Sequence, residues 1–324
     1  MRFLTITCNP AIDTTYLIER LSPGAINRVE RVLPAAGGKG NNVARVLARL
    51  GHTPIATGFA GGHTGRFIED GLRAAGVAPA FVAISGDSRI CFTVVEQETG
   101  RTTEIREPGS GVTHAEVDRL VARVSDLAAE TDVAVISGSL PPGAPPDLYA
   151  RLIGMLKAAN VYVALDSSGE PLRAGAAACP DLIKPNREEL GDLLRAAMDS
   201  YPTEPTFPEH PRLIGQVVPV DGTILLSQGA DGATLLRRSR SYRATPPRIE
   251  AINTVGAGDA LLAGFLHARA TGMDYRESLA FAVATGTASV LAESVGAVDP
   301  TEIERLRAKI TISNVASTMV GATA

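Results

Sequence analysis

Two hydrophobic periods follow each other in the first part of the chain. From Met1 to Cys8, apolar residues alternate with threonines, which predicts a strand that ends at Asn9-Pro10. Beyond the glycine-rich turn at 37–40, valines and leucines recur at helical spacing, and Gly51 stands where a helix commonly ends. The chain is therefore expected to begin with a strand, an irregular stretch, a tight turn and a helix.

The next segments point to a small β element. After a second expected helix over 65–75, residues 80–84 and 89–106 are rich in β-branched side chains, and no helical pattern separates them. We expect antiparallel strands around a turn at 98–100.

From about residue 115, strand-like and helix-like patterns alternate. Helices are expected over 115–129, 147–159, 187–198, 257–271 and 275–292, and strands over 133–137, 161–165, 182–184, 223–227 and 233–237. This alternation predicts the α/β class, with a doubly wound, mainly parallel sheet covered on both faces. No repeat or linker divides the chain, so one domain over 1–324 is expected. Prolines at every third position within 200–212 favour an extended, polyproline-like loop there.

Composition and charge exclude several classes of protein. The 324 residues are 45% hydrophobic, and 31 basic residues nearly balance 35 acidic ones. No basic face is available for nucleic acid. The three cysteines are too few and too scattered for a disulfide framework or a CxxC site, and the five histidines never fall at metal-ligand spacing. Without a long apolar run or a signal-peptide pattern, a cytoplasmic protein that contacts no membrane is expected.

The segment TVGAGD, residues 254–259, is the most informative for chemistry. It opens a long apolar helix, and the N–H groups of Gly256, Ala257 and Gly258 can converge on one point at the positive end of that helix. Asp259 within this anion hole suits a base that works beside a phosphate, or it is only a helix cap. Leu261 replaces the third glycine of a dinucleotide fingerprint, and no P-loop exists. A nicotinamide dehydrogenase is therefore disfavoured.

Three further segments offer polar groups to a ligand. In GGKGNN, residues 37–42, glycines allow close approach and Lys39 and Asn42 supply polar groups, so that with Asp13 a polyol site is plausible; an ordinary turn is the alternative. KPNREE, residues 184–189, follows a strand, where α/β sheets bind ligands. Its lysine and asparagine suit phosphates and Glu189 suits a hydrated Mg²⁺, although a plain helix start has the same pattern. Residues 227–232 form another strand-to-glycine turn, which alone indicates only a hairpin.

Taken in order, these segments resemble the ribokinase-like carbohydrate kinases, in particular the phosphofructokinase B branch. GGKGNN and TVGAGD match the two signatures of that family, and NPAID, ISGSLP, DSSG and KPN also match. The likeness extends from residue 1 to about 300. Within the branch, the chain is most similar to 1-phosphofructokinases and tagatose-6-phosphate kinases.

The resemblance implies a role for each matching residue. Asp259 would be the catalytic base, with Gly256, Ala257 and Gly258 as the anion hole. The ATP site would be formed by Lys184, Asn186, Ser227, Gly229, Gly232 and Gly258, with Glu189 acting on Mg²⁺ through water. The phosphosugar would be held by Asp13, Gly38, Lys39, Asn42, Arg89 and Ser139. Parts of about 12–36 and 80–107 would form a β lid, which would also contribute to a homodimer.

Departures from the family pattern refine the expected substrate. Asn253 replaces an aspartate of the ribokinase and adenosine kinase relatives, as is common in phosphosugar kinases. Gln228 replaces a common leucine, and 200–212 stands where relatives have a helix, which leaves the donor preference open. We expect fructose 1-phosphate as substrate and fructose 1,6-bisphosphate as product. Tagatose-6-phosphate kinase, 6-phosphofructokinase and a nucleoside kinase are alternatives. A non-catalytic sugar-phosphate sensor is a rival from another class, disfavoured by Asp259 and Lys184.

Overall fold

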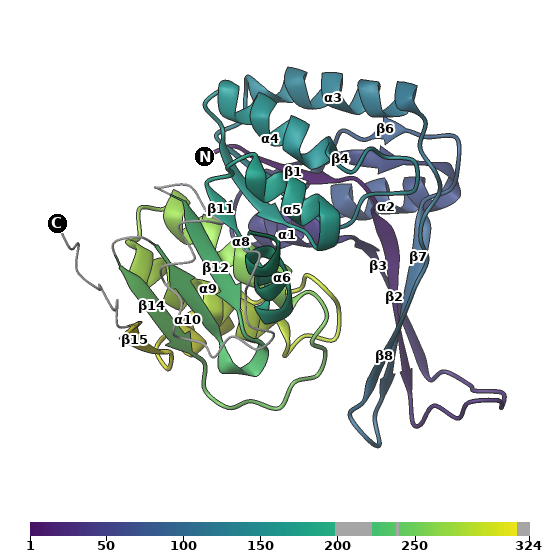
Figure 1. Cartoon of the computed structure of the whole chain (residues 1–324). Helices are drawn as coiled ribbons and strands as arrows, with labels where there is room; N and C mark the ends of the chain where they lie inside the picture. The colour runs from purple at the N-terminus through teal and green to yellow at the C-terminus, as the bar shows by residue number, and fades with distance from the viewer. Residues whose placement is uncertain (198–221, 238–239, 316–324) are drawn as a thin grey trace.

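The centre of the molecule is a buried strand, β1 (Phe3–Thr7), with a parallel neighbour on each side. The computed structural model describes residues 1–197, 222–237 and 240–315 (Figure 1). β1 pairs with β4 (Ile55–Ala60) and with β9 (Val133–Ser137). All five residues of β1 are buried, which explains why its threonines do not mark a solvent face.

The large sheet extends from this centre in both directions. Its order is β15 (Thr311–Val315), β14 (Ser241–Thr245), β13 (Ala233–Leu236), β12 (Thr223–Ser227), β11 (Leu182–Ile183), β10 (Tyr162–Asp166), β9, β1, β4 and β5 (Ala78–Pro79), and β6 (Val82–Ala83) also pairs with β4. All pairs from β12 to β5 are parallel, and the three pairs from β12 to β15 are antiparallel. The expected mainly parallel sheet is confirmed.

Helices cover both faces of this sheet. One face carries α3 (His114–Ala128), α4 (Leu148–Ala158), α5 (Gly169–Ala177) and α6 (Arg187–Ala197), and the other carries α1 (Lys39–Arg49), α8 (Ala257–Ala270), α9 (Tyr275–Ser289) and α10 (Pro300–Arg307). α2 (Gly62–Ala74) packs at the β5 edge. The neighbours Val135 and Ile136 of β9 belong to opposite cores, as the two-residue period of a strand requires. The doubly wound arrangement follows.

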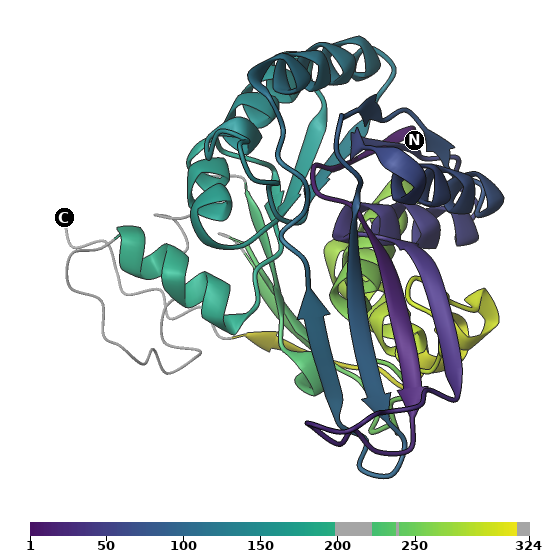
Figure 2. The same ribbon diagram turned by 90° about the vertical axis from the view of Figure 1, so that its right-hand side faces the viewer.

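A second sheet projects from the carboxyl ends of the large one (Figures 1 and 2). Its order is β3 (Arg31–Gly37), β2 (Ala11–Ile18), β7 (Arg89–Glu96) and β8 (Thr102–Arg106). β2 and β7 run parallel, whereas β7 and β8 form the expected antiparallel hairpin. The expectation that residues 80–84 belong to this element is wrong. Val82 is buried and pairs with Phe59 of β4, which makes this segment an extension of the large sheet.

Several element ends agree with the sequence pattern, and others differ. α1 and α2 are followed by Gly51 and Gly76, whose φ angles of 89° and 81° only glycine adopts without strain. α9 ends at Ser289, three residues before the expected 292, and the next residue, Val290, accepts hydrogen bonds from the Ile252 and Asn253 N–H groups. The proline-spaced stretch 200–212 lies outside the described residues. Throughout the described segments, no helix has the length and hydrophobicity needed to cross a membrane.

Candidate active site

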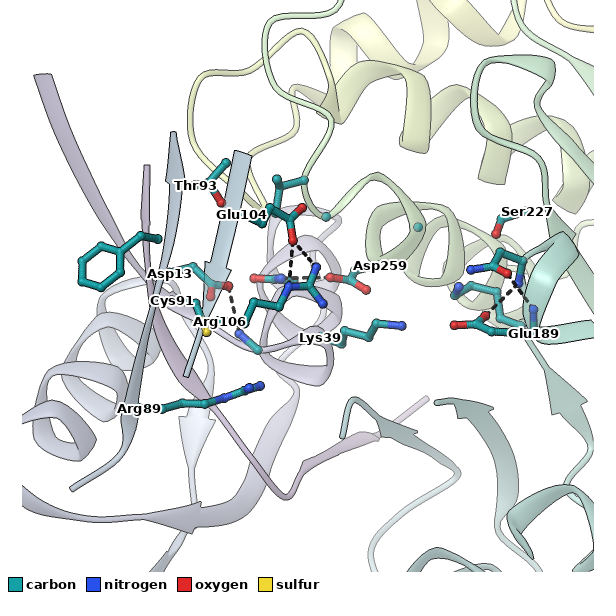
Figure 3. Close-up of a pocket in the computed structure, with 18 residues that line it drawn as sticks. Asp13, Lys39, Arg89, Cys91, Thr93, Glu104, Arg106, Glu189, Ser227 and Asp259 are labelled. Atoms are coloured by element: carbon teal, nitrogen blue, oxygen red, sulfur yellow. Dashed lines mark hydrogen bonds and ion pairs between the residues drawn. The ribbon is translucent and has the colours of Figure 1, made fainter. Parts of the chain in front are cut away.

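A cavity of about 280 Å³ lies where the carboxyl ends of the large sheet meet the small sheet (Figure 3). Its walls are formed by Asp13, Gly38, Lys39, Asn42, Arg89, Cys91, Phe92, Thr93, Glu104, Arg106, Lys184, Asn186, Glu189, Ser227, Val255, Gly256, Gly258 and Asp259. Most of the predicted site residues therefore share one cavity, although they are far apart in the sequence. In Figure 3, Asp259 and Lys39 lie between the small-sheet residues and the group around Glu189 and Ser227.

Helix α8 begins at this cavity without a capping side chain. Gly256 precedes the helix in the left-handed conformation, with φ 81°, and among the described residues no side chain caps the first turn. The Asp259 side chain instead reaches helix α1, where its Oδ2 accepts a hydrogen bond of 2.9 Å from Asn42 Nδ2. The simple helix-cap interpretation of Asp259 is therefore wrong. The Ala257 N–H donates to the Thr254 carbonyl at 3.4 Å, whereas the Gly258 N–H has no backbone partner among the described residues and is available to an anion.

The environment of Asp259 changes its acidity. The residue is only 5% exposed, and burial raises the pKa of its carboxyl from 3.8 to about 7, with a further contribution from the Asp166 charge. Lys39, the Asn42 amide and Lys184 act in the opposite direction. A carboxyl that titrates near neutral pH is well matched to general-base catalysis.

Two lysines meet at a second buried carboxylate, Asp166. Lys39 Nζ lies 3.0 Å from Asp166 Oδ1 and Lys184 Nζ lies 3.2 Å from Oδ2. Burial alone would raise the pKa of Asp166, but the Lys184 and Lys39 ammonium groups outweigh it and lower that pKa. The Asp166 charge in turn raises the pKa of Lys39. Asp166, at the end of β10, thus holds two ammonium groups beside Asp259, the candidate for the base. No role was predicted for Asp166 from the sequence, although the DSSG segment contains it.

On the small sheet, three residues stand in register across three strands. Asp13 of β2 lies opposite Cys91 of β7, which lies opposite Arg106 of β8. Arg106 Nε donates a 2.7 Å hydrogen bond to Glu104 Oε2. Sequence reasoning missed Cys91, Phe92, Thr93, Glu104, Arg106 and Val255. The two-residue period starting at Arg89 is the signal that could have found Cys91 and Thr93.

Arg89 is anchored to the chain between the two sheets. Its Nη2 donates a 2.9 Å hydrogen bond to the Asn9 carbonyl, and its Nη1 donates a 2.9 Å bond to the Glu107 carbonyl. Arg89 is therefore not a freely solvated charge. Asp13 Oδ2 accepts a 3.2 Å hydrogen bond from the Gly38 N–H, and burial raises the pKa of this carboxyl against the opposing effects of Gly38 and Arg89.

The opposite end of the cavity is the start of α6. The Asn186 and Glu189 side chains accept hydrogen bonds from each other's backbone N–H, both at 2.8 Å. These bonds are those of an ordinary helix start, which was the alternative interpretation of the KPNREE segment. Both residues nevertheless also line the cavity, together with Ser227. In the described segments, no three His, Cys, Asp or Glu side chains form a metal cluster. Glu189 is a carboxylate on this end of the cavity, of the type that can hold a hydrated Mg²⁺.

Four predicted site residues lie outside the cavity lining: Ser139, Gly229, Gly232 and Ala257. Ser139 Oγ accepts a 3.4 Å hydrogen bond from Asn9 Nδ2, so it lies near the Arg89 anchor. At Gly232, with φ 89°, an added Cβ would come within 2.1 Å of the Ala244 carbonyl oxygen. A glycine is therefore required there by the positive φ of the β12–β13 turn and by the close approach of β14.

Comparison with known proteins places this arrangement in a family. The profile of the pfkB family carbohydrate kinases matches residues 5–302. A 1-phosphofructokinase of Vibrio cholerae is 34% identical over 319 residues, 98% of each chain. A tagatose-6-phosphate kinase of Staphylococcus epidermidis is 32% identical over 315 residues, which are 96% of this chain and 99% of that protein.

Solved structures agree with these relatives. Phosphofructokinase-2 from Escherichia coli, in complex with substrates and products, superposes with a TM-score of 0.86 at 27% identity and covers 95% of this chain and 99% of its own. Its tetrameric inhibited form gives 0.84 at 28% identity, with coverages of 95% and 98%. These similarities define the chain as a phosphotransferase that acts on an alcohol group. The chain belongs to the pfkB family of carbohydrate kinases, and within it to the group of phosphosugar kinases that use ATP.

Proposed function

We propose that this kinase phosphorylates fructose 1-phosphate at its free primary hydroxyl to give fructose 1,6-bisphosphate, with Asp259 as the base. The observation that carries the proposal is a buried carboxyl with pKa about 7, placed between an uncapped helix start and two lysines. Phosphoryl transfer depends mainly on positioning and on stabilising charge, and this group of residues supplies both.

The proton is handled by Asp259. The carboxylate accepts the proton of the sugar hydroxyl while the oxygen attacks the γ-phosphorus in line. Asn42 donates to one carboxylate oxygen at 2.9 Å, which fixes the orientation of the other toward the cavity. The Gly258 N–H, in the first turn of α8 at the cavity wall, would meet the negative charge of the transferred group.

Lys39 is better suited to the transferred phosphoryl group than to the phosphate already on the sugar. Its ammonium group is paired with Asp166 at 3.0 Å and lies near enough to Asp259 for that charge also to raise the pKa of Lys39. Lys184 reaches the same carboxylate. Both lysines therefore face the point where the γ-phosphate would arrive.

The phosphate on the sugar is assigned to the small-sheet end. Arg89 and Arg106 line that end of the cavity and are close enough to Asp13 to affect its pKa. Asp13 and Asn42 would bind ring hydroxyls: Asn42 Oδ1 is buried and has no hydrogen-bond partner among the described residues. A buried acceptor of this kind is costly unless a ligand completes its bonding.

Glu189 is the residue proposed to meet Mg²⁺ through water, with Lys184, Asn186 and Ser227 beside the nucleotide phosphates. Glu189 is half-buried, lines the cavity and keeps one carboxylate oxygen that bonds to no backbone group of the α6 start. A bound Mg²⁺ would supply positive charge to the phosphate oxygens.

The choice of sugar is tested by initial rates on fructose 1-phosphate, tagatose 6-phosphate and fructose 6-phosphate at matched ATP and Mg²⁺. We expect fructose 1-phosphate to give the highest kcat/KM, by roughly five- to 150-fold for each ring hydroxyl that is misread. Tagatose 6-phosphate is the second candidate because the tagatose-6-phosphate kinase relative matches over 99% of its length. A tenfold higher kcat/KM for that sugar would make it the preferred substrate instead of fructose 1-phosphate. Binding without ADP release on all three sugars would favour the sensor alternative.

A homodimer through the small sheet is part of the proposal. Ile26, Val29, Val32 and Ile105 are large apolar side chains of this region that are exposed to solvent, which is typical of a surface that binds another chain. A second copy of the chain is the proposed occupant. Sedimentation equilibrium of the wild type and of the Val32→Asp/Ile105→Asp variant tests this, and a monomeric wild type would contradict it.

A further inference from the structure

The far end of β3 is joined to the body of the molecule by one side-chain pair. Arg31 Nη1 and Nη2 donate to the two carboxylate oxygens of Glu293 at 2.9 and 2.8 Å. Within residues 1–197, 222–237 and 240–315, this is the only ion pair between the small sheet and the rest of the chain. In Figure 2, the purple edge strand of the small sheet runs beside yellow segments of the C-terminal part of the chain.

Arg31 is the residue of β3 at which a link to the body of the molecule resists movement of the small sheet most strongly. We call the Arg31–Glu293 pair the tether. The strand leaves the large-sheet side at Gly37, next to α1, and Arg31 is its first residue. At about 3.3 Å per residue, the tether is roughly 20 Å from that attachment. A contact so far from the attachment point resists a swing of the whole sheet away from the cavity.

Glu293 also belongs to the segment that supports the start of α8. Its backbone carbonyl accepts a 3.0 Å hydrogen bond from Asn253 Nδ2, and Asn253 Oδ1 accepts one of 3.0 Å from the Val255 N–H. Two residues further on, Val295 packs so closely on Gly256 that a Cβ there would lie 2.8 Å from Val295 Cγ1. The segment 290–296 therefore contacts both the small sheet and the anion-binding turn.

We propose that Arg31 and Glu293 form a positioning pair that couples closure of the small sheet over the sugar phosphate to the placement of the Gly256–Gly258 turn. Neither side chain lines the cavity, so the pair acts through β3 on one side and through Asn253 on the other. The inference rests on the sugar kinase activity but not on which phosphosugar is used.

The kinetic test compares Arg31→Met with Arg101→Met. Arg101 lies in the β7–β8 turn, directly before β8, and its Nε is 3.9 Å from Glu96 Oε1 of β7. Its loss therefore removes a charge of the small-sheet region and leaves the Arg31–Glu293 pair intact. Because Arg31 and Glu293 are about half-exposed, we expect a rise of roughly two- to fivefold in KM for the sugar phosphate. KM for ATP stays unchanged, ATP hydrolysis without sugar increases, and Arg101→Met behaves as wild type.

Charge exchange separates a specific pair from a general loss of structure. Arg31→Glu alone places two carboxylates together and should raise the sugar KM further, whereas Arg31→Glu/Glu293→Arg should restore it to within about twofold of wild type. Near 1 M salt the differences should shrink, since the screening length falls to about 3 Å. No recovery in the double variant, or equal effects of Arg31→Met and Arg101→Met, would overturn the proposal.

Amide hydrogen exchange in the absence of any substrate tests the coupling independently of turnover. In Arg31→Met, exchange should accelerate both in β3 and in residues 253–258, whereas Arg101→Met should change only the β7–β8 turn. If none of the three sugars is phosphorylated, the proposed substrate is wrong but this measurement still decides the coupling. Acceleration confined to β3, or none at all, would contradict it.

Discussion

The two ends of the cavity are built from different kinds of structure. On the large-sheet side, Asp166 is fully buried at the end of β10, and two lysines hold its charge. On the small-sheet side, the Arg106 side chain is 66% exposed and its partner Glu104 comes from the same strand. The residues proposed for the transfer step thus lie on buried elements, whereas the residues proposed for sugar recognition lie on a sheet with more exposed side chains.

The largest effect is expected on the fixed side, at Asp259. Asp259→Asn should lower kcat by about 10²- to 10⁴-fold, because the amide accepts no proton from the hydroxyl. Folding should not suffer. A raised carboxyl pKa stabilises the fold most below the unfolded value, near 4, and this stabilisation is lost as pH rises through about 7.

At pH 8 the Asp259→Asn variant should therefore melt at or above the wild-type temperature. Asp126→Asn, at an exposed position of α3, is the matched control and should change neither kcat nor Tm. A variant that keeps more than about a tenth of the wild-type kcat would show that Asp259 is not the base.

The second expected effect is on stability, at Asp166. Asp166→Asn leaves two lysine ammonium groups without their shared carboxylate, and breaking a buried ion pair from one side costs about 3–5 kcal/mol. Denaturant unfolding measures the loss. Asp70→Asn, which removes a helix-surface pair with a 75% exposed carboxylate, should change the free energy of unfolding by less than about 0.5 kcal/mol. Equal losses in the two variants would contradict the importance given to burial.

On the small-sheet side, Arg89→Ala should raise KM for the sugar phosphate far more than KM for ATP, although it also removes the bonds to the Asn9 and Glu107 carbonyls. Loss of charge-assisted hydrogen bonds to the sugar's phosphate costs about 1.5–3 kcal/mol each, which is roughly ten- to 150-fold in KM. Arg106→Ala should have a smaller effect in the same direction, because Glu104 already competes for its guanidinium. KM for ATP serves as the internal control, and similar increases for both substrates would refute the assignment.

The same contrast explains how far the sequence alone could predict the site. Lys184 and Asp259 could be identified because each stands where a strand or a glycine turn passes into a helix, which local spacing reveals. Cys91 and Arg106 reach the cavity only because β2, β7 and β8 pair in one register. No local pattern contains that register, so these residues were missed.

In the fold, most buried strands of the large sheet and the longer helices could be predicted from hydrophobic period. β2 and β3, which occupy the stretch expected to be irregular, could not, and neither could β4. Gly58 interrupts its pattern, and the structure shows why a glycine is needed there: an added Cβ would lie 1.9 Å from the Thr7 carbonyl oxygen. β14 and β15 also could not be predicted, because they pair with each other although three helices separate them in the chain. α5 and α10 are short, so their apolar period covers too few turns to stand out.

The central claim is that a buried carboxyl with a pKa near neutrality takes the proton from the sugar hydroxyl. The most direct test is the pH dependence of kcat/KM for the preferred sugar phosphate between pH 5 and 9. We expect the rate to fall about tenfold per pH unit below a pKa of about 7, and this acid limb to be absent from the residual activity of Asp259→Asn. A rate that stays level down to pH 5, or an identical acid limb in the variant, would contradict the account.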